Sequence, residues 1–507
     1  MQNKSRTYNS IINIIFSLGN QLITIFLNFF SRAIFIKILG AEYLGINGLF
    51  SDILMMLSLA DLGLGSAMVY SFYKPLAEKN NKKIAALVKF YKKIYNFIAI
   101  SITVIGISIM PFLNIIVKTD KPIANFKLYY ILFLLNSVMS YLFVYKSSIL
   151  NADQKGYIIS TYSTIINSLR IIIQTIFLLM TKNYIIFLII QIIGTFLNNL
   201  FLAYKANKIY TFINEDYNLE EEEKKIIFEN IKSVFLYKLS GVLLNGTDNM
   251  IMSGIVGTIY VGYYSNYNLI IGTISKFITN SFSSLNASIG NLITDDEKEK
   301  RYKVFKILQT ISFILGGICC ICLYVLINDF IILWIGKEFL FDEFTLISIL
   351  LNFYIAAVLP PVWSFREATG LFRKTKYIML ITAVINLIFS VVLGIRYGIG
   401  GIILASAIAK LSTYFWYEPI ILFKSYFNKS IREYFFKHLY NVIILLVLTI
   451  ICKIISDKII VLSFIELFVK AIICFVIATA GYLMAYIRTN ELKELLERVK
   501  NIVIRGK

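Results

Sequence analysis

The sequence predicts an all-α integral membrane protein with about 14 transmembrane helices in two pseudo-symmetric bundles. Three observations support this fold class. Hydrophobic residues occupy 58% of the 507 positions and the mean hydropathy is +0.73, whereas soluble domains are about 45–50% apolar. The excess lies in repeated apolar runs of about 20 residues, the length that crosses a bilayer. A glycine-containing motif also recurs in both halves of the chain.

The apolar runs are continuous, which favours helices, because the strands of a membrane β-barrel alternate polar and apolar positions. The first run follows Lys4 and Arg6, as in a signal peptide, but it is too long for one, so we expect a retained helix. A helix break is expected at Pro360 and Pro361. The predicted spans are 10–36, 45–72, 92–117, 127–150, 157–180, 184–207, 232–256, 261–289, 304–328, 344–368, 376–396, 399–423, 438–456 and 460–487.

The basic residues indicate the orientation of the spans. The formal net charge is +20, and with a cytoplasmic N-terminus most lysines and arginines fall in inner segments, as the positive-inside rule requires. We therefore expect both termini in the cytoplasm. The charge then faces anionic membrane lipids, and nucleic acid is not an expected partner. The first inner loop carries Lys74, Lys79, Lys82, Lys83, Lys89, Lys92 and Lys93.

We predict four regions along the chain. Residues 1–210 form an N-terminal helical bundle of spans one to six, and residues 232–426 form a C-terminal bundle of spans seven to twelve. The acidic stretch INEDYNLEEEEKK lies in a cytoplasmic linker at 211–231. Residues 427–507 add two spans and the amphipathic tail ELKELLERVKNIVIRGK, which we expect to lie on the inner membrane surface.

An internal repeat supports the division into two halves. ILGAEYLGINGLFSDI at 38–53 aligns without gaps with IVGTIYVGYYSNYNLI at 255–270. The alignment pairs Gly40, Tyr43 and Gly45 with Gly257, Tyr260 and Gly262. Two related bundles of spans are the usual construction of an alternating-access transporter, with the substrate site between the halves.

Charged and amide side chains lie inside the predicted spans, where a charge costs about +2.5 to +3.5 kcal/mol on insertion scales. Many form one-sided stripes at helical spacing, which predicts an aqueous cavity with a cationic excess that would bind a phosphate or diphosphate group. The candidate substrate-binding cations are Arg32, Arg170, Lys238, Lys276, Arg366 and Lys410. The candidates for ion coupling or gating are Asp61, Asp248 and Glu367, and the polar cavity residues are Asn28, Asn245, Asn249 and Asn268.

Several candidates have structural alternatives that the sequence leaves open. Lys238 and Arg366 lie within about two turns of the inner boundary and could snorkel to it, and Arg32 could snorkel outward. Asp248 could pair with Lys238. Asp61 is either a salt-bridge partner or a titrating ion site.

No catalytic or metal-binding pattern is found in the sequence. The single histidine, His438, is expected to be structural or solvated. The outer loops are short, whereas a membrane-embedded glycosyltransferase or polymerase would need a substantial one, so we expect neither enzymatic activity nor a cofactor. The cysteines lie inside apolar runs at no spacing that suits a metal or a disulfide framework: Cys319, Cys320, Cys322, Cys452 and Cys474.

Three stretches carry a resemblance to a known family. RAIFIKILGAEYLGINGLFSDILMMLSLADLGLGSAMVYSFYKPLAE closely resembles the opening of bacterial polysaccharide repeat-unit flippases. These are the Wzx-like O-antigen and capsule flippases of the MOP superfamily, which also holds the lipid II flippase and the MATE drug exporters. GTDNMIMSGIVGTIYVGYYSNYNLI resembles the start of their second half, and SFREATGLFRKTKY resembles the segment after their tenth span. The resemblance covers most of residues 10–425.

The resemblance implies a MATE-like fold that moves an undecaprenyl-diphosphate-linked oligosaccharide between leaflets of the bacterial cytoplasmic membrane by alternating access. The implied partners are this lipid-linked oligosaccharide, membrane lipids, and polymerase and other polysaccharide-assembly proteins. The implied charged cavity or gating groups are Arg32, Asp61, Asp248 and Arg366. Arg170, Lys276 and Lys410 are assigned from spacing instead. The alternative on the same fold is a MATE-type multidrug or cation antiporter, disfavoured because in-span bases outnumber in-span acids.

Overall fold

The computed structural model describes residues 6–58, 64–117, 123–283, 285, 289, 292 and 298–505. Side chains of some helical residues in these ranges, including 6–18, 232–238 and 243–245, lie outside the description. The regular elements in these ranges are all helices. The chain divides into two compact units, Met1–Gly262 and Tyr263–Lys507, which are called unit 1 and unit 2 below.

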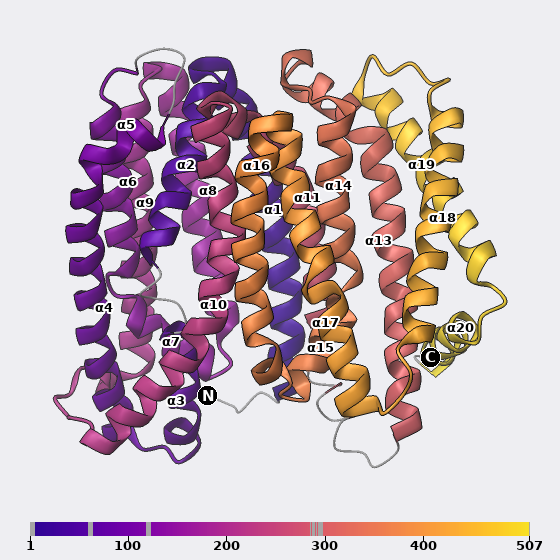
Figure 1. Cartoon of the computed structure of the whole chain (residues 1–507). Helices are drawn as coiled ribbons and strands as arrows, with labels where there is room; N and C mark the ends of the chain where they lie inside the picture. Colours follow the sequence, from indigo (N-terminus) through magenta and orange to yellow (C-terminus); the bar gives the residue numbers. More distant parts are fainter. Residues whose placement is uncertain are drawn as a thin grey trace. The chain divides into compact units, whose positions relative to one another are not determined.

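Unit 1 contains several long helices that are apolar enough to cross a bilayer, among them α4, α8 and α9. Figure 1 shows α4, α6 and α9 close together, and α8 packs against both α1 and α9. The helices are α1 (Arg6–Leu39), α2 (Ala41–Leu57), α3 (Leu64–Ala77), α4 (Asn81–Ile109), η2 (Met110–Phe112), α5 (Leu113–Ile116), α6 (Phe126–Tyr141), α7 (Val144–Ala152), α8 (Gly156–Thr181), α9 (Tyr184–Ile209), η3 (Thr211–Asn214) and α10 (Glu221–Ile255).

Unit 2 contains the remaining helices, and α11 begins just before its boundary. Within it α13 packs against α14, α18 and α19, and α14 packs against α16 (Figure 1). The helices are α11 (Thr258–Ser283), α13 (Lys298–Trp334), η4 (Lys337–Phe339), α14 (Glu343–Val358), α15 (Pro360–Ala368), α16 (Phe372–Ser412), α17 (Tyr414–Leu422), η5 (Phe423–Phe427), α18 (Arg432–Ser456), α19 (Phe464–Tyr486) and α20 (Asn490–Arg505).

Helices occupy each predicted span over the described residues. The break expected at Pro360 is confirmed, because α14 ends at Val358 and α15 begins at the proline. The spans predicted at 376–396 and 399–423 are joined in α16, where Gly398 alone leaves helical geometry with φ 62°. A positive φ of this kind costs glycine little, since it has no Cβ.

Length and composition identify which helices could cross a membrane. Eight described helices qualify, or up to ten if each of two bent pairs is one span. The bent pairs are α1 with α2, which meet at 119°, and α6 with α7, which meet at 46°. Helices α10 and α11, which carry several amide and charged residues, are not among those that qualify. The predicted class, an all-helical multi-pass membrane protein, is therefore confirmed.

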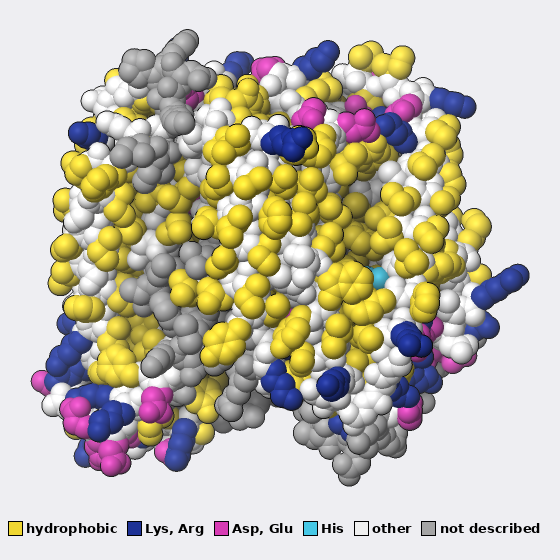
Figure 2. All heavy atoms as spheres, in the orientation of Figure 1, with side chains coloured by type: hydrophobic (Ala, Val, Ile, Leu, Met, Phe, Trp, Pro, Cys, Tyr) yellow, Lys and Arg dark blue, Asp and Glu magenta, His cyan; other side chains and the backbone are white. Residues whose placement is uncertain are grey.

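Apolar side chains cover the outside of the helices, as expected of surfaces that face lipid. On α8, Leu169 is 53% exposed and Met180 is 75% exposed. Figure 2 shows hydrophobic side chains across the middle of the visible face, with charged side chains toward its two ends. On this face the charged side chains therefore lie mainly toward the ends of the helices.

The segment predicted as a linker, 211–231, forms η3 and the start of α10 and is tied to α4. Lys89 forms an ion pair with Asp216, and Lys83 forms one with Glu223. Lys89 also donates to the Asn218 side chain at 2.9 Å. The division at Gly262 reflects internal packing, and the four predicted regions with their boundaries remain a prediction.

Candidate functional site

Arg170 and Gln174, which lie on one face of α8 and are called the α8 stripe below, face the neighbouring helix α9. The Gln174 side chain donates a hydrogen bond to the Phe187 carbonyl at 2.9 Å. Arg170 lays its aliphatic stem over Gly194, where an added Cβ would lie 2.5 Å from the arginine Cδ. Gly194 is therefore needed for the arginine to fit between the two helices.

Arg170 is a candidate cation to which the described residues supply no counter-ion. Its Nε is buried without a hydrogen-bond partner, and no ion pair or hydrogen bond joins its guanidinium to another described residue. A guanidinium is planar, permanently charged and carries several N–H donors, which suits phosphate oxygens. In a low-dielectric surrounding such a group favours an anion strongly.

Arg32 lies on α1, which packs against α8. Next to it, the Ser31 hydroxyl accepts a hydrogen bond from Thr175 of α8 at 2.8 Å. Arg32 and Asn28 are partly buried, and Arg32 takes part in an interaction within the protein. The α1–α8 contact thus sets the position of Arg32 along the helix axis relative to the α8 stripe.

An acidic group that the sequence analysis missed lies between α2 and α10. The Asn249 amide donates to Asp52 at 2.5 Å, while its own buried Oδ1 accepts no hydrogen bond from the part of the chain that the structure describes. Asp248 acts electrostatically on Asp52 and is itself engaged. Asp52 follows a serine in the repeat motif and resembles an ordinary helix-surface residue, so spacing alone gave no sign of it. Asp61 and the side chains of Lys238 and Asn245 lie outside the described residues.

In unit 2 the candidate cation Arg366 forms a buried ion pair with Glu418 of α17. Arg366 is 2% exposed and Glu418 is 1% exposed. The exposed Glu367 carboxylate is a second partner of Arg366 at 3.6 Å. The sequence analysis missed Glu418, and its only signal was one acidic residue before Pro419 in an apolar run.

The other unit 2 candidates differ in their surroundings. Lys410 of α16 donates to the Asn352 side chain at 2.8 Å, and Asn352 in turn donates to the Ile403 carbonyl. Lys410 therefore helps to hold α16 against α14. Lys276 and Asn268 are exposed on α11.

A further in-span pair, also missed from sequence, joins α19 to α13. Lys470 donates to Asp329 at 2.7 Å, and its side chain is 7% exposed. The described structure therefore neutralises both Arg366 and Lys470 with carboxylates. Arg170 differs from them in lacking such a partner among the described residues.

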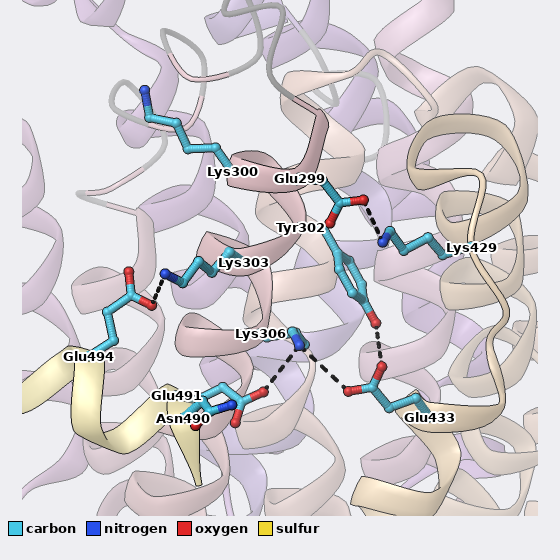
Figure 3. A pocket seen from close by; sticks show the side chains of 10 residues that line it. All are labelled: Glu299, Lys300, Tyr302, Lys303, Lys306, Lys429, Glu433, Asn490, Glu491 and Glu494. Atoms are coloured by element: carbon cyan, nitrogen blue, oxygen red, sulfur yellow. Dashed lines mark hydrogen bonds and ion pairs between the residues drawn. The ribbon is translucent and has the colours of Figure 1, made fainter.

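A cavity of about 450 Å³ opens at one end of unit 2, between α13, α18 and α20 (Figure 3). Lysines and glutamates line it in equal number. Lys303 pairs with Glu494 at 2.9 Å, and Lys306 lies 3.5 Å from Glu491. The charge balance gives this cavity no preference for an anion, and its ion pairs attach the tail helix α20 to the bundle. Its lining residues are Glu299, Lys300, Tyr302, Lys303, Lys306, Lys429, Glu433, Asn490, Glu491 and Glu494.

Comparison with known proteins establishes the fold. No protein-family model matches the chain. Lipid II flippase MurJ in an inward closed conformation superimposes with a TM-score of 0.70 and 17% identity, covering 94% of this chain and all of MurJ. An inward-facing MATE multidrug resistance transporter of the MOP superfamily gives a TM-score of 0.61 and 14% identity, covering 80% of this chain and 97% of that one. The chain thus has the multi-pass membrane fold shared by MurJ and the MATE transporters.

One curated relative adds a genetic context. An uncharacterized membrane protein in the cps region of Klebsiella pneumoniae is 26% identical over 273 residues. The match covers 51% of this chain and spans 53% of that protein, about half of its length.

Proposed function

We propose that the protein moves an undecaprenyl-diphosphate-linked oligosaccharide repeat unit from the inner to the outer leaflet of the bacterial cytoplasmic membrane. The observation that carries the proposal is Arg170, a partly buried in-span cation whose Nε is buried and which has no carboxylate partner among the described residues. Its natural ligand is an anion, and the diphosphate of a polyprenyl carrier is an anion that must cross the membrane interior to change leaflet.

Two further findings support a lipid-linked substrate. The fold is that of a lipid II flippase, and a relative lies in a cps region. Both point toward cell-envelope polysaccharide, with membrane lipids as surroundings and polymerase and other assembly proteins as proposed partners. We assign the protein no enzymatic role.

The proposed mechanism is alternating access. The Arg170 guanidinium receives phosphate oxygens of the head group, and the hydrophobic stem of the arginine stays packed on Gly194. Arg32 and Lys410 remain predicted substrate contacts, whereas Arg366 is already neutralised by Glu418. We propose cytoplasmic N- and C-termini, in accord with the basic inner loops.

The test measures movement of labelled lipid-linked oligosaccharide in vesicles that contain the full-length protein. Arg170→Ala removes a charge-assisted contact, and we expect transport to fall about tenfold or more. Arg170→Lys should retain part of the activity. The matched control is Lys182→Ala, because Lys182 is exposed at the end of the same helix. Normal transport by folded Arg170→Ala would refute the proposal.

The Asp52–Asn249 contact favours a second candidate function, a MATE-type multidrug or cation antiporter. That activity requires in-span carboxylates that bind cations, and Asp52 with neighbouring Asp248 supplies them. Asp52→Asn distinguishes the two. An antiporter would lose uptake of an organic cation in this variant, whereas a flippase would show no such uptake at any stage.

A further inference from the structure

The two copies of the glycine motif touch each other inside unit 1. A Cβ added to Gly45 would lie 2.0 Å from the carbonyl oxygen of Thr258. A Cβ added to Gly262 would lie 2.2 Å from the carbonyl oxygen of Ala41. Gly45 aligns with Gly262 in the repeat, and Ala41 aligns with Thr258. The contact is therefore reciprocal, because each glycine lies on the carbonyl of the other copy's first helical residue.

The local backbone positions both copies in the same way. Gly40 precedes α2 with φ +88°, and Gly257 precedes α11 with φ +130°. Residues other than glycine rarely adopt such positive φ angles. These turns allow α2 and α11 to begin directly at the contact. The repeat seen in the sequence therefore corresponds to a pseudo-symmetric crossing of two helix ends.

The crossing is closed and dry. Thr258 is 1% exposed, and Ile46 and Val261 are fully buried beside it. Backbone lies directly on backbone, since no Cβ fits at either glycine. A Cβ at Gly48, one turn further along α2, would reach only ordinary contact with Val261 at 3.4 Å. The tightest part of the seam is thus confined to the two glycines.

We propose that this crossing is the outer gate of the transporter, closed by the two glycines and opened when the motif copies part. The inference rests on the proposed alternating-access function and orientation. Helices that meet at glycines can approach each other closely, because no side chains lie between them. They can also separate without any rearrangement of interlocked side chains. A side chain at either glycine would hold the copies apart and shift the population toward the outward-open state.

The first arm of the test locks the gate. Gly48→Cys with Val261→Cys brings two cysteines into contact, since a Cβ at Gly48 would lie 3.4 Å from Cγ1 of Val261, and a disulfide needs such close side chains. Mass mapping of the cysteine-containing peptides identifies this disulfide apart from the native cysteines. Oxidation should abolish movement of labelled lipid-linked oligosaccharide in vesicles, and reductant should restore it. A cross-linked protein that transports at the rate of the reduced protein would overturn the proposal.

The second arm opens the gate and needs no substrate. Met252→Cys places a reporter at a fully buried position close to the crossing. A membrane-impermeant maleimide added outside should label it about tenfold faster in Gly45→Ala or Gly262→Ala, because overpacking destabilises the closed state. Gly254→Ala is the matched control, since nothing lies within 4 Å of an added Cβ there.

The two arms separate failure of the gate from failure of the proposed function. Suppose that labelling is faster in the alanine variants but no form of the protein transports lipid-linked oligosaccharide. That result would support the proposed gate and refute the proposed substrate. Unchanged labelling in alanine variants that unfold at the wild-type temperature would refute the gate. If those variants do not fold, the disulfide arm alone decides the question.

Discussion

Arg366→Met removes the cation from the most deeply buried ion pair that the described structure contains. Arg366 and Glu418 are 2% and 1% exposed, so neither group recovers water when the other is lost. Breaking a buried pair by removing one partner costs about 3–5 kcal/mol, because an uncompensated charge remains. We expect Arg366→Met to lose about this much, since Glu418 then keeps no cationic partner among the described residues.

The reciprocal change should cost less. Glu418→Gln leaves Arg366 with the exposed Glu367 carboxylate at 3.6 Å, so we expect a loss of about 2 kcal/mol. Replacing both residues by apolar ones of similar size, Arg366→Met with Glu418→Leu, should return stability to within about 1 kcal/mol of the wild type.

The assay is unfolding of the purified protein in mixed micelles by titrated denaturing detergent. The double-mutant cycle, completed by the single variant Glu418→Leu, isolates the pairwise energy, which should be about 3 kcal/mol or more. The control is the exposed pair Lys74–Glu78, whose removal should change stability by about 0.5 kcal/mol or less. A double variant as unstable as Arg366→Met would refute the reasoning, since it would mean that packing and not unpaired charge sets the cost.

Three further predictions concern unit 2. Tyr482→Phe should be neutral or slightly stabilising in the same unfolding assay, because no described residue offers the buried hydroxyl a hydrogen bond that the change would remove. Lys470→Met should cost about 1–2 kcal/mol, less than Arg366→Met, because the Asp329 side chain left behind is 26% exposed. Burial, the largest single influence, would raise the pKa of Glu491, but the hydrogen bond and charge of Lys437, a backbone hydrogen bond and the charge of Lys306 together outweigh it and lower the pKa. The ionised Glu491 carboxylate therefore contributes to folding stability above the ordinary carboxyl pKa, and this contribution is lost as the pH falls through the lower pKa of the folded state. The protection factors of the α20 amides, which allow for the intrinsic pH dependence of hydrogen exchange, should fall on acidification, and Glu491→Gln should weaken that dependence.

Sequence reasoning identified the class of the protein and most positions of its helices. Continuous apolar runs predicted helices without reference to any contact, and Pro360 predicted the break between α14 and α15. Charges inside the spans were also visible, but their partners were not. Glu418 lies 52 positions from Arg366, and Asp329 lies 141 from Lys470. Pairing at such separations depends on how helices pack, which no local pattern encodes.

The repeat illustrates the same division. The matched glycines were evident from the alignment of residues 38–53 with 255–270, yet only the folded backbone reveals that Gly45 and Gly262 lie on each other's partner carbonyls. The polar residues of α8 show the same division. Their spacing in the sequence placed Arg170 and Gln174 on one face of the helix, but only the structure shows that α9 packs against that face.

The amino-acid sequence alone determined that this chain spans a membrane many times, because transfer of apolar segments into lipid depends on local composition. The tertiary structure alone decided which buried charges are neutralised and which, such as Arg170, remain without a carboxylate among the described residues. Electrostatic energy depends on the distance between groups in space, and helix packing sets that distance.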